Sequence, residues 1–258
     1  MADRIAAAFA SHGKAAALMP YVMGGFPDVD SSRAVAEACI DAGADVLELG
    51  IPFSDPLADG PVIHAAAVEA LRSGATTEAV LGVCAAVSGR VPVVLMVYAN
   101  VVLSRGVGDF ASRAAAAGAA GLIVPDLPHD EAADTRAACD ERGIALVPLV
   151  APTTTEERVA DIGRDARGFV YAVSLSGTTG EREVVAEGIG AMVERVRAAT
   201  EVPVAVGFGI SSGEQARQVA AMADGVIVGT RVVRAAGEGG ACEAGAVVAD
   251  LAAALREG

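Results

Sequence analysis

Carboxylates grouped in one short segment are the residues of this sequence best placed to do chemistry. Glu48 lies in an apolar run, and Asp55 and Asp59 follow in a loop restricted by three prolines. Side chains alternate along a strand, so Glu48 faces away from Leu47 and Leu49. If these leucines pack outward against helices, Glu48 points into a barrel or cleft. An acid is costly to bury there, so its presence indicates a functional role. The competing interpretation is a turn whose aspartates cap a helix or bind their own backbone.

The elements that must position these acids alternate between strand and helix. Short apolar, β-branched runs predict eight strands, at residues 17–23, 45–51, 92–98, 121–125, 144–150, 169–175, 203–208 and 225–229. Stretches with helical spacing lie between them, at residues 32–42, 78–87, 109–117, 130–142, 156–162, 187–199 and 213–222. This α/β pattern predicts a (β/α)8 TIM barrel. A doubly wound sheet is the alternative, but no Gly-rich dinucleotide-binding turn follows the first strand.

Additional short helices complete the predicted fold. They are expected at residues 4–10, between residues 61 and 73, and after Gly229, where glycines at 237–240 separate a short helix from the last one. Helix N-caps are expected at Ser31 or Ser32, Thr76 or Thr77, Thr154 or Thr155, and Ser211 or Ser212. We expect residues 1–258 to form a single barrel domain, because a chain with 53% apolar content can fill one large core.

The composition argues against several classes of function. A net charge of −14 repels nucleic-acid backbones, so nucleic-acid binding is not expected. No uncharged stretch approaches the roughly 18–20 apolar residues of a membrane span, and the N-terminus lacks a signal peptide, so a cytoplasmic protein without membrane association is expected. Four separated cysteines and three histidines show no metal-ligand spacing, so no structural metal is expected.

Aromatic side chains gather where such a barrel does its chemistry, at the C-terminal ends of the strands. The sequence has only three tyrosines, and Tyr21, Tyr98 and Tyr171 all fall within predicted strands. Phe208 lies at the end of another. Taken alone, each ring either fills the core or lines a site for a flat apolar ligand.

Glycines follow the last three predicted strands, where backbone amides can bind a phosphate without a lysine or arginine. They are Gly177 and Gly180, then Gly207 and Gly209, then Gly229 beside Thr230. Arg231 comes next, and it either helps to neutralise the phosphate or points to solvent. Amide binding of this kind is compatible with the acidic net charge.

Residues 47–61 resemble the signature of the tryptophan synthase α chain. Five further segments fall in the order and spacing of that family: Gly24-Gly25-Phe26-Pro27, Tyr98-Ala99-Asn100, Pro125-Asp126-Leu127-Pro128, Ser176-Gly177-Thr178-Thr179-Gly180 and Gly207-Phe208-Gly209-Ile210-Ser211. The resemblance therefore extends over nearly the whole chain. It departs a little at Gly229-Thr230-Arg231, where many members have Gly-Ser followed by a small residue, although Thr230 keeps the hydroxyl.

The resemblance implies reversible cleavage of indole-3-glycerol phosphate to indole and glyceraldehyde 3-phosphate. It implies Glu48 as acid and base, with a pKa raised by its apolar setting, and Asp59 as the carboxylate that accepts the indole N–H. The implied substrate-binding residues are Tyr21, Ile63, Met96, Tyr98, Ile123, Tyr171, Thr179 and Phe208, and the implied phosphate-binding residues are Gly180, Gly209, Gly229 and Thr230. Loops 53–60 and 175–185 are expected to act as lids, with Thr179 reaching toward Asp59.

The resemblance also implies a partner. It is the tryptophan synthase β chain in an α2β2 heterotetramer, which receives the indole, and Asp55 is expected at the interface. Pyridoxal phosphate is expected only in the β chain, and no cofactor in this one. No Schiff-base lysine is called for, because Lys14, the only lysine, precedes the first strand.

Three other interpretations remain open at this stage. A sugar-phosphate epimerase or isomerase would share the phosphate loops, but not the Pro-Phe-Ser-Asp-Pro loop, and it usually needs metal-binding histidines. A catalytically silent subunit would only activate its partner, although Glu48 and Asp59 are both retained. A free-standing lyase would release indole without a β chain, and co-purification would distinguish it.

Overall fold

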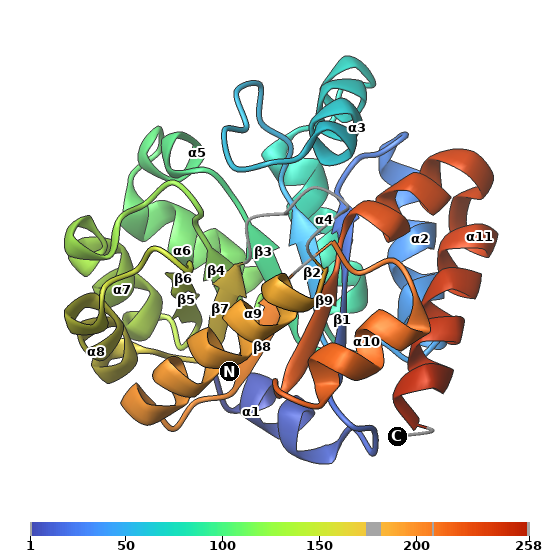
Figure 1. Ribbon diagram of the computed structural model, residues 1–258. Coiled ribbons are helices and arrows are strands. Elements are labelled where there is room, and N and C mark those ends of the chain that lie inside the picture. Colours follow the sequence, from blue (N-terminus) through green and yellow to red (C-terminus); the bar gives the residue numbers. More distant parts are fainter. Residues whose placement is uncertain (1, 174–181, 208, 257–258) are drawn as a thin grey trace.

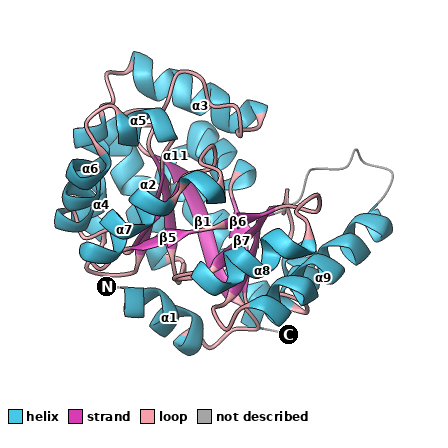
Figure 2. Ribbon diagram, turned by 90° about the vertical axis from the view of Figure 1, so that its left-hand side faces the viewer, coloured by secondary structure: helices cyan, strands magenta, loops and turns pink. Residues whose placement is uncertain are grey.

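The strands of this chain stand side by side around a barrel, and helices cover the outside (Figures 1 and 2). The computed structural model describes residues 2–173, 182–207 and 209–256. All strand pairs are parallel, in the order β5-β4-β3-β2-β1-β9-β8-β7-β6. The predicted TIM barrel is confirmed. Within the described ranges, no helix is long and apolar enough to cross a membrane.

Each segment predicted as a strand contains a strand, and the ends differ by a few residues. The strands are β1 (Ala17–Met23), β2 (Leu47–Gly50), β3 (Val93–Met96), β4 (Gly121–Ile123), β5 (Ala145–Val147), β6 (Leu149–Val150), β7 (Val170–Val173), β8 (Val204–Gly207) and β9 (Gly225–Val228). The helices are α1 (Ala2–Ser11), α2 (Val29–Asp41), α3 (Pro61–Arg72), α4 (Thr77–Val87), α5 (Ala99–Leu103), α6 (Val107–Ala116), η1 (His129–Glu131), α7 (Ala133–Glu141), α8 (Glu156–Asp165), α9 (Arg182–Ala199), α10 (Gly213–Ala220) and α11 (Thr230–Arg256).

The alternation of side chains along the strands builds two cores. Leu47 and Leu49 of β2 belong to the outer core, between the strands and the helices. Val46 and Val94 belong to the inner core that fills the barrel. Glu48 shares the inward face with Val46, because successive side chains of a strand point to opposite sides.

Helix α1 closes the N-terminal end of the barrel. Its Ile5 and Phe9 belong to the inner core, and the ring of Phe9 lies 5.7 Å from that of Phe169. Near the same end, the buried Lys14 pairs with Asp45 at 2.8 Å. The opening of the barrel therefore lies at the C-terminal ends of the strands, where β2 leads into residues 51–60.

Three predicted elements were wrong in detail. The strand at 144–150 is broken into β5 and β6, because Pro148 has no N–H to continue the ladder. The helix at 130–142 divides into η1 and α7. The strand at 92–98 ends at Met96, so Tyr98 is not within a strand but caps the unpredicted helix α5.

Helix ends follow local capping chemistry. Thr76, Thr155 and Ser212 cap α4, α8 and α10 as predicted, each accepting a backbone N–H. The expected cap at Ser31 or Ser32 was wrong, because Asp28 accepts the N–H of Ser31 and α2 begins at Val29. Gly240 interrupts α11 with a φ of 63°, which confirms the predicted separation of a short helix from the last one.

Candidate active site

Glu48 is a buried acid at the base of the barrel opening. It lies in β2, where it is the register partner of Tyr21 in β1 and of Val94 in β3. Its side chain is 1% exposed, and its Oε2 atom has no hydrogen-bond partner among the described residues. Burial, with a smaller contribution from the charge of Asp59, raises the pKa of Glu48 to about 8. Glu48 therefore holds a proton at neutral pH and can donate it.

Asp59 is the second acid of the site, and its surroundings favour the ionised form more than those of Glu48. Burial raises the pKa of Asp59 to about 6, and a hydrogen bond from Tyr98 and the charge of His64 act in the opposite direction. The two carboxyl groups thus have separated pKa values. At neutral pH the arrangement supplies one protonated and one ionised carboxyl group.

The hydroxyl of Tyr98 holds the loop that carries Asp59. It accepts the backbone N–H of Ala58 at 3.1 Å, and it donates to the Asp59 carboxylate. The ring of Tyr98 stacks on Phe53, with 5.2 Å between ring centroids. Asp126, from the loop after β4, accepts the N–H of Ala99 at 2.8 Å and so secures the first turn of α5 behind Tyr98.

Replacing Tyr98 by phenylalanine is expected to lower turnover about tenfold. The ring keeps its stack on Phe53, but the hydroxyl that joins Ala58 to Asp59 is lost, and a typical hydrogen bond to a charged group contributes about 1.5–3 kcal/mol. Steady-state kinetics of Tyr98→Phe test this. An unchanged turnover would mean that the loop is held without this hydroxyl.

A cavity of about 250 Å³ brings most of the predicted site residues together at the C-terminal ends of the strands. Its lining consists of Tyr21, Glu48, Ala58, Asp59, Gly60, Ile63, Met96, Tyr171, Gly207, Gly209, Ile210, Ile227, Gly229 and Thr230. Tyr98 contacts the loop above it, and Ile123 belongs to the inner core. Thr179, Gly180 and Phe208 lie outside the described residues, as does most of the expected lid at 175–185.

Sequence reasoning did not assign Ala58, Ile210 or Ile227 to the site. Ile210 lies within residues 207–211, one of the segments that resemble the family, so the sequence could have indicated its place in the site. Ile227 is an inward residue of β9, and its place could be found only by applying the strand alternation to that strand.

The rings of Tyr21 and Tyr171 pack against glycines of neighbouring strands. A Cβ atom on Gly50 would lie 2.0 Å from the hydroxyl oxygen of Tyr21, and one on Gly207 would lie 2.4 Å from that of Tyr171. Only glycine leaves room for these rings, whose faces and edges form apolar walls around Glu48. The cavity therefore has the shape and polarity for a flat aromatic group with one polar edge.

Gly209, Gly229 and Thr230 also line this cavity. Thr230 is the first residue of α11, and a helix N-terminus favours an anion. Arg231 points away from this position, because its guanidinium donates to the carbonyl oxygen of Ser211 at 2.5 Å. A phosphate here would be bound by backbone N–H groups and by the Thr230 hydroxyl.

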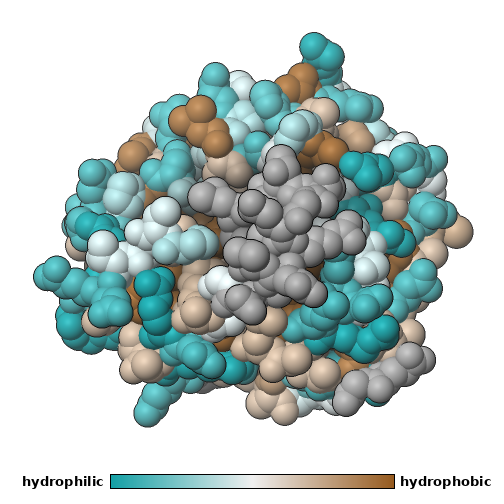
Figure 3. All heavy atoms as spheres, in the orientation of Figure 1, coloured by the Kyte–Doolittle hydropathy of each residue, from teal (hydrophilic) through white to brown (hydrophobic). Residues whose placement is uncertain are grey.

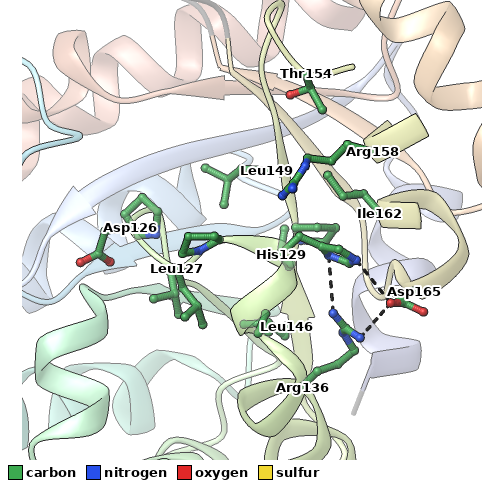
Figure 4. A pocket seen from close by; sticks show the side chains of 16 residues that line it. Asp126, Leu127, His129, Arg136, Leu146, Leu149, Thr154, Arg158, Ile162 and Asp165 are labelled. Atoms are coloured by element: carbon green, nitrogen blue, oxygen red, sulfur yellow. Dashed lines mark hydrogen bonds and ion pairs between the residues drawn. The ribbon is translucent and has the colours of Figure 1, made fainter. Parts of the chain in front are cut away.

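A second cavity, of about 330 Å³, lies between α7 and α8 (Figure 4). In it, Asp165 accepts a hydrogen bond from Arg136 at 2.8 Å and lies 3.4 Å from Nε2 of His129. Arg158 pairs with Asp130. Its arginines are thus each paired with an aspartate, and neither Glu48 nor Asp59 lines it. The separated pKa values at Glu48 and Asp59 make the first cavity the candidate active site.

Metal-binding residues do not gather in the described parts of the chain: no three His, Cys, Asp or Glu side chains come together there. Cys39, Cys84 and Cys139 are buried in α2, α4 and α7 as packing residues, and Cys242 is exposed.

Comparisons with known proteins find relatives that match almost the whole chain. A family model described as the tryptophan synthase alpha chain matches residues 8–256. The tryptophan synthase alpha chain of Geobacter sulfurreducens is 44% identical, over 99% of this chain and 98% of that protein. That of Synechococcus elongatus is 46% identical, over 88% of this chain and 86% of that protein.

Solved structures agree as well. A structure of Mycobacterium tuberculosis tryptophan synthase has a TM-score of 0.91 and 43% identity, covering 99% of each chain. Tryptophan synthase subunit alpha from Legionella pneumophila has a TM-score of 0.89 and 34% identity, covering 98% of each chain. The sequence matches these relatives, and the fold matches these solved structures, over nearly the full length of the chain. This protein therefore belongs to the tryptophan synthase alpha chain family.

Proposed function

We propose that the cavity around Glu48 and Asp59 is the active site of a carbon–carbon lyase. The chain cleaves indole-3-glycerol phosphate to indole and glyceraldehyde 3-phosphate in tryptophan biosynthesis, and residues 1–258 act as one domain. The observation that carries the site assignment is the pair of carboxyl groups with separated pKa values in one cavity. The direct test is indole release from indole-3-glycerol phosphate by the purified chain, with and without a β chain.

The reaction requires one proton to move from a side-chain hydroxyl to the indole ring. Protonated Glu48 donates its proton to ring carbon C3, and positive charge develops at the ring nitrogen. The Asp59 carboxylate accepts the N–H and stabilises that charge. Ionised Glu48 then removes the proton from the hydroxyl on the carbon next to the ring. The carbon–carbon bond breaks, its electron pair returns to the ring, and the hydroxyl carbon becomes the aldehyde.

The remaining lining residues orient the substrate. Tyr21, Ile63, Met96 and Tyr171 enclose the flat ring. The phosphate binds at Gly209, Gly229 and Thr230, which line the same cavity, and the family pattern adds Thr179, Gly180 and Phe208 to the substrate site. Binding the ring and the phosphate in one cavity positions the scissile bond beside Glu48.

Members of this family do not bind pyridoxal phosphate themselves, and the proposed steps use only side chains of this chain. We expect the chain to work without a cofactor in the cytoplasm. Pyridoxal phosphate belongs to the β chain, which consumes the indole.

Membership of the family implies a tryptophan synthase β chain as partner, and we propose an α2β2 heterotetramer. The loop after β2 offers contacts for it. Leu57 is 93% exposed at the tip of this loop, and the exposed Asp55 lies beside it. Outside the grey area, the face shown in Figure 3 is largely hydrophilic, with small apolar groups in its upper part. The family partner supplies the reason to expect a contact here, and a partner bound to this loop would fix the position of Asp59, which the same loop carries.

The β chain is expected to stimulate indole formation, and Asp55→Ala is expected to reduce this stimulation more than the basal rate. Asp55 takes no part in the proposed proton transfers, so its replacement should weaken contact with the β chain rather than the chemical step. Titration of the β chain into native and variant proteins measures the effect. Asp250→Ala, on the exposed face of α11, is the matched control. Equal rates with and without the β chain, and no complex on gel filtration, would favour a free-standing lyase.

A further inference from the structure

Tyr21 and Glu48 form a cross-strand pair inside the barrel. They are register partners in the parallel pairing of β1 with β2. Both side chains are buried, at 3% and 1% exposure, and both line the 250 Å³ cavity. Adjacent strands lie about 4.7–4.9 Å apart, so the two side chains leave the barrel wall next to each other.

Each of the two has a polar atom with a poor partner or none. The hydroxyl of Tyr21 donates only to the sulfur of Met23, at 3.8 Å, among the described residues. A thioether is a weak acceptor. The Oε2 atom of Glu48 has no partner in the same part of the chain. Buried polar groups are nearly always satisfied, so a weakly bonded hydroxyl beside an unpaired carboxyl oxygen requires an explanation.

During the reaction the hydrogen-bonding requirement of Glu48 changes. After Glu48 gives up its proton it is a carboxylate in a desolvated site, and an ionised buried carboxylate is costly without hydrogen-bond donors. The titratable groups that interact with it are Tyr21 from β1, Tyr171 from β7 and Asp59 from the loop after β2. Tyr98, after β3, interacts with Asp59 rather than with Glu48. Asp59 repels it, and the hydroxyl of Tyr98 is engaged by Ala58 and Asp59.

Tyr21 is better held for this task than Tyr171. It is the register partner of Glu48, and its side chain is the more deeply buried of the two. Its ring lies against Gly50, as that of Tyr171 lies against Gly207. Gly50 follows Glu48 by two residues on the same face of β2, so the Tyr21 hydroxyl lies at the level of the strand end. The phenolic O–H can turn from the sulfur of Met23 toward Glu48, and the role proposed below requires the Glu48 side chain to rotate toward it.

We propose that Tyr21 is a positioning residue that exchanges acceptors during the reaction: its hydroxyl leaves the sulfur of Met23 and donates a hydrogen bond to Glu48 whenever Glu48 is ionised. No proton is transferred to or from Tyr21. The bond lowers the cost of the carboxylate state, so it eases proton donation to the ring and holds Glu48 toward the substrate hydroxyl. This role rests on the proposed lyase function.

The test is the pH dependence of kcat/KM for native protein, Tyr21→Phe and Met23→Leu. Glu48 must start protonated, so its ionisation sets the limb on which activity falls as pH rises. Removing a donor from the ionised form raises the pKa, and Tyr21→Phe should move this limb upward by about half to one pH unit and lower kcat roughly three- to tenfold. Met23→Leu conserves volume and removes only the competing acceptor. It should keep kcat within about twofold of native and move the limb downward or not at all.

A second measurement does not depend on activity. Infrared titration of the Glu48 carboxyl band, identified by its loss in Glu48→Gln, should show the same upward shift in Tyr21→Phe. A changed melting temperature with an unchanged titration would assign Tyr21 a purely structural role and overturn the proposal, as would a shift seen in Tyr171→Phe but not in Tyr21→Phe. If native protein releases no indole, the proposed function fails, and the infrared titration still decides whether Tyr21 stabilises ionised Glu48.

Discussion

Replacing Glu48 by glutamine is expected to lower turnover by about 10²- to 10⁴-fold, the usual contribution of one acid–base group. Glutamine has nearly the same shape but can neither donate the proton to the ring nor accept the one from the hydroxyl. The inner core around Val46 and Val94 keeps its packing, so the barrel should remain folded. Single-turnover measurements, with enzyme in excess over indole-3-glycerol phosphate, would isolate the chemical step.

The pH profile of the native protein provides an independent view of the same pair. In the proposed mechanism, activity requires ionised Asp59 and protonated Glu48, whose pKa values are raised to about 6 and about 8. The rate should therefore rise as pH increases through about 6 and fall as it increases through about 8. In Asp59→Asn the acid limb should disappear while the basic limb persists.

Stability should respond to pH with a defined sign. The ordinary pKa of glutamic acid is 4.5, and that of Glu48 in the folded state is about 8. The folded protein therefore binds this proton more tightly than the unfolded chain, and the contribution of Glu48 to stability falls as pH rises from about 4.5 to about 8. The stability of Glu48→Gln should not show this decrease with pH, because glutamine does not titrate.

A folded Glu48→Gln that retains near-native turnover would show that another group transfers the protons.

Replacing Asp59 by asparagine is expected to lower turnover by about 10²- to 10³-fold, the range seen when one preorganised electrostatic group is removed. The amide can still accept the indole N–H but carries no negative charge, so it no longer stabilises the positive ring. Asp59 is half-buried at the edge of the cavity, and asparagine keeps its shape, so stability should change by less than about 1 kcal/mol. Kinetics and thermal unfolding, measured on one preparation, separate the two effects.

Asp28→Asn is a matched control for this charge removal. Asp28 caps α2 through the N–H of Ser31, and asparagine caps helices equally well. It removes one negative charge from a loop without touching the cavity, so turnover should stay near that of the native protein. A large loss of stability in Asp59→Asn with a proportionate loss of activity would instead support the interpretation of Asp59 as a loop cap.

The strand and helix pattern was predictable because it depends on local periodicity. Alternating leucines around Glu48 set the face on which the acid lies, and eight repeats of strand and helix favour a closed barrel over an open sheet. The interruption at Pro148 and the short helix after Tyr98 were not predicted. Both depend on where the ladder with neighbouring strands ends, which a single segment does not reveal.

The sequence by itself determined the fold class, the family and the inward face of Glu48, since these follow from residue order and from the geometry of a strand. The tertiary structure decided what surrounds that acid. Tyr21 reaches it from another strand, Asp59 from a loop and Tyr171 from the far side of the barrel. Desolvation and the nearby charge of Asp59 raise the pKa of Glu48, and both are sums over neighbours far apart in the chain. Only the closed barrel brings those neighbours together.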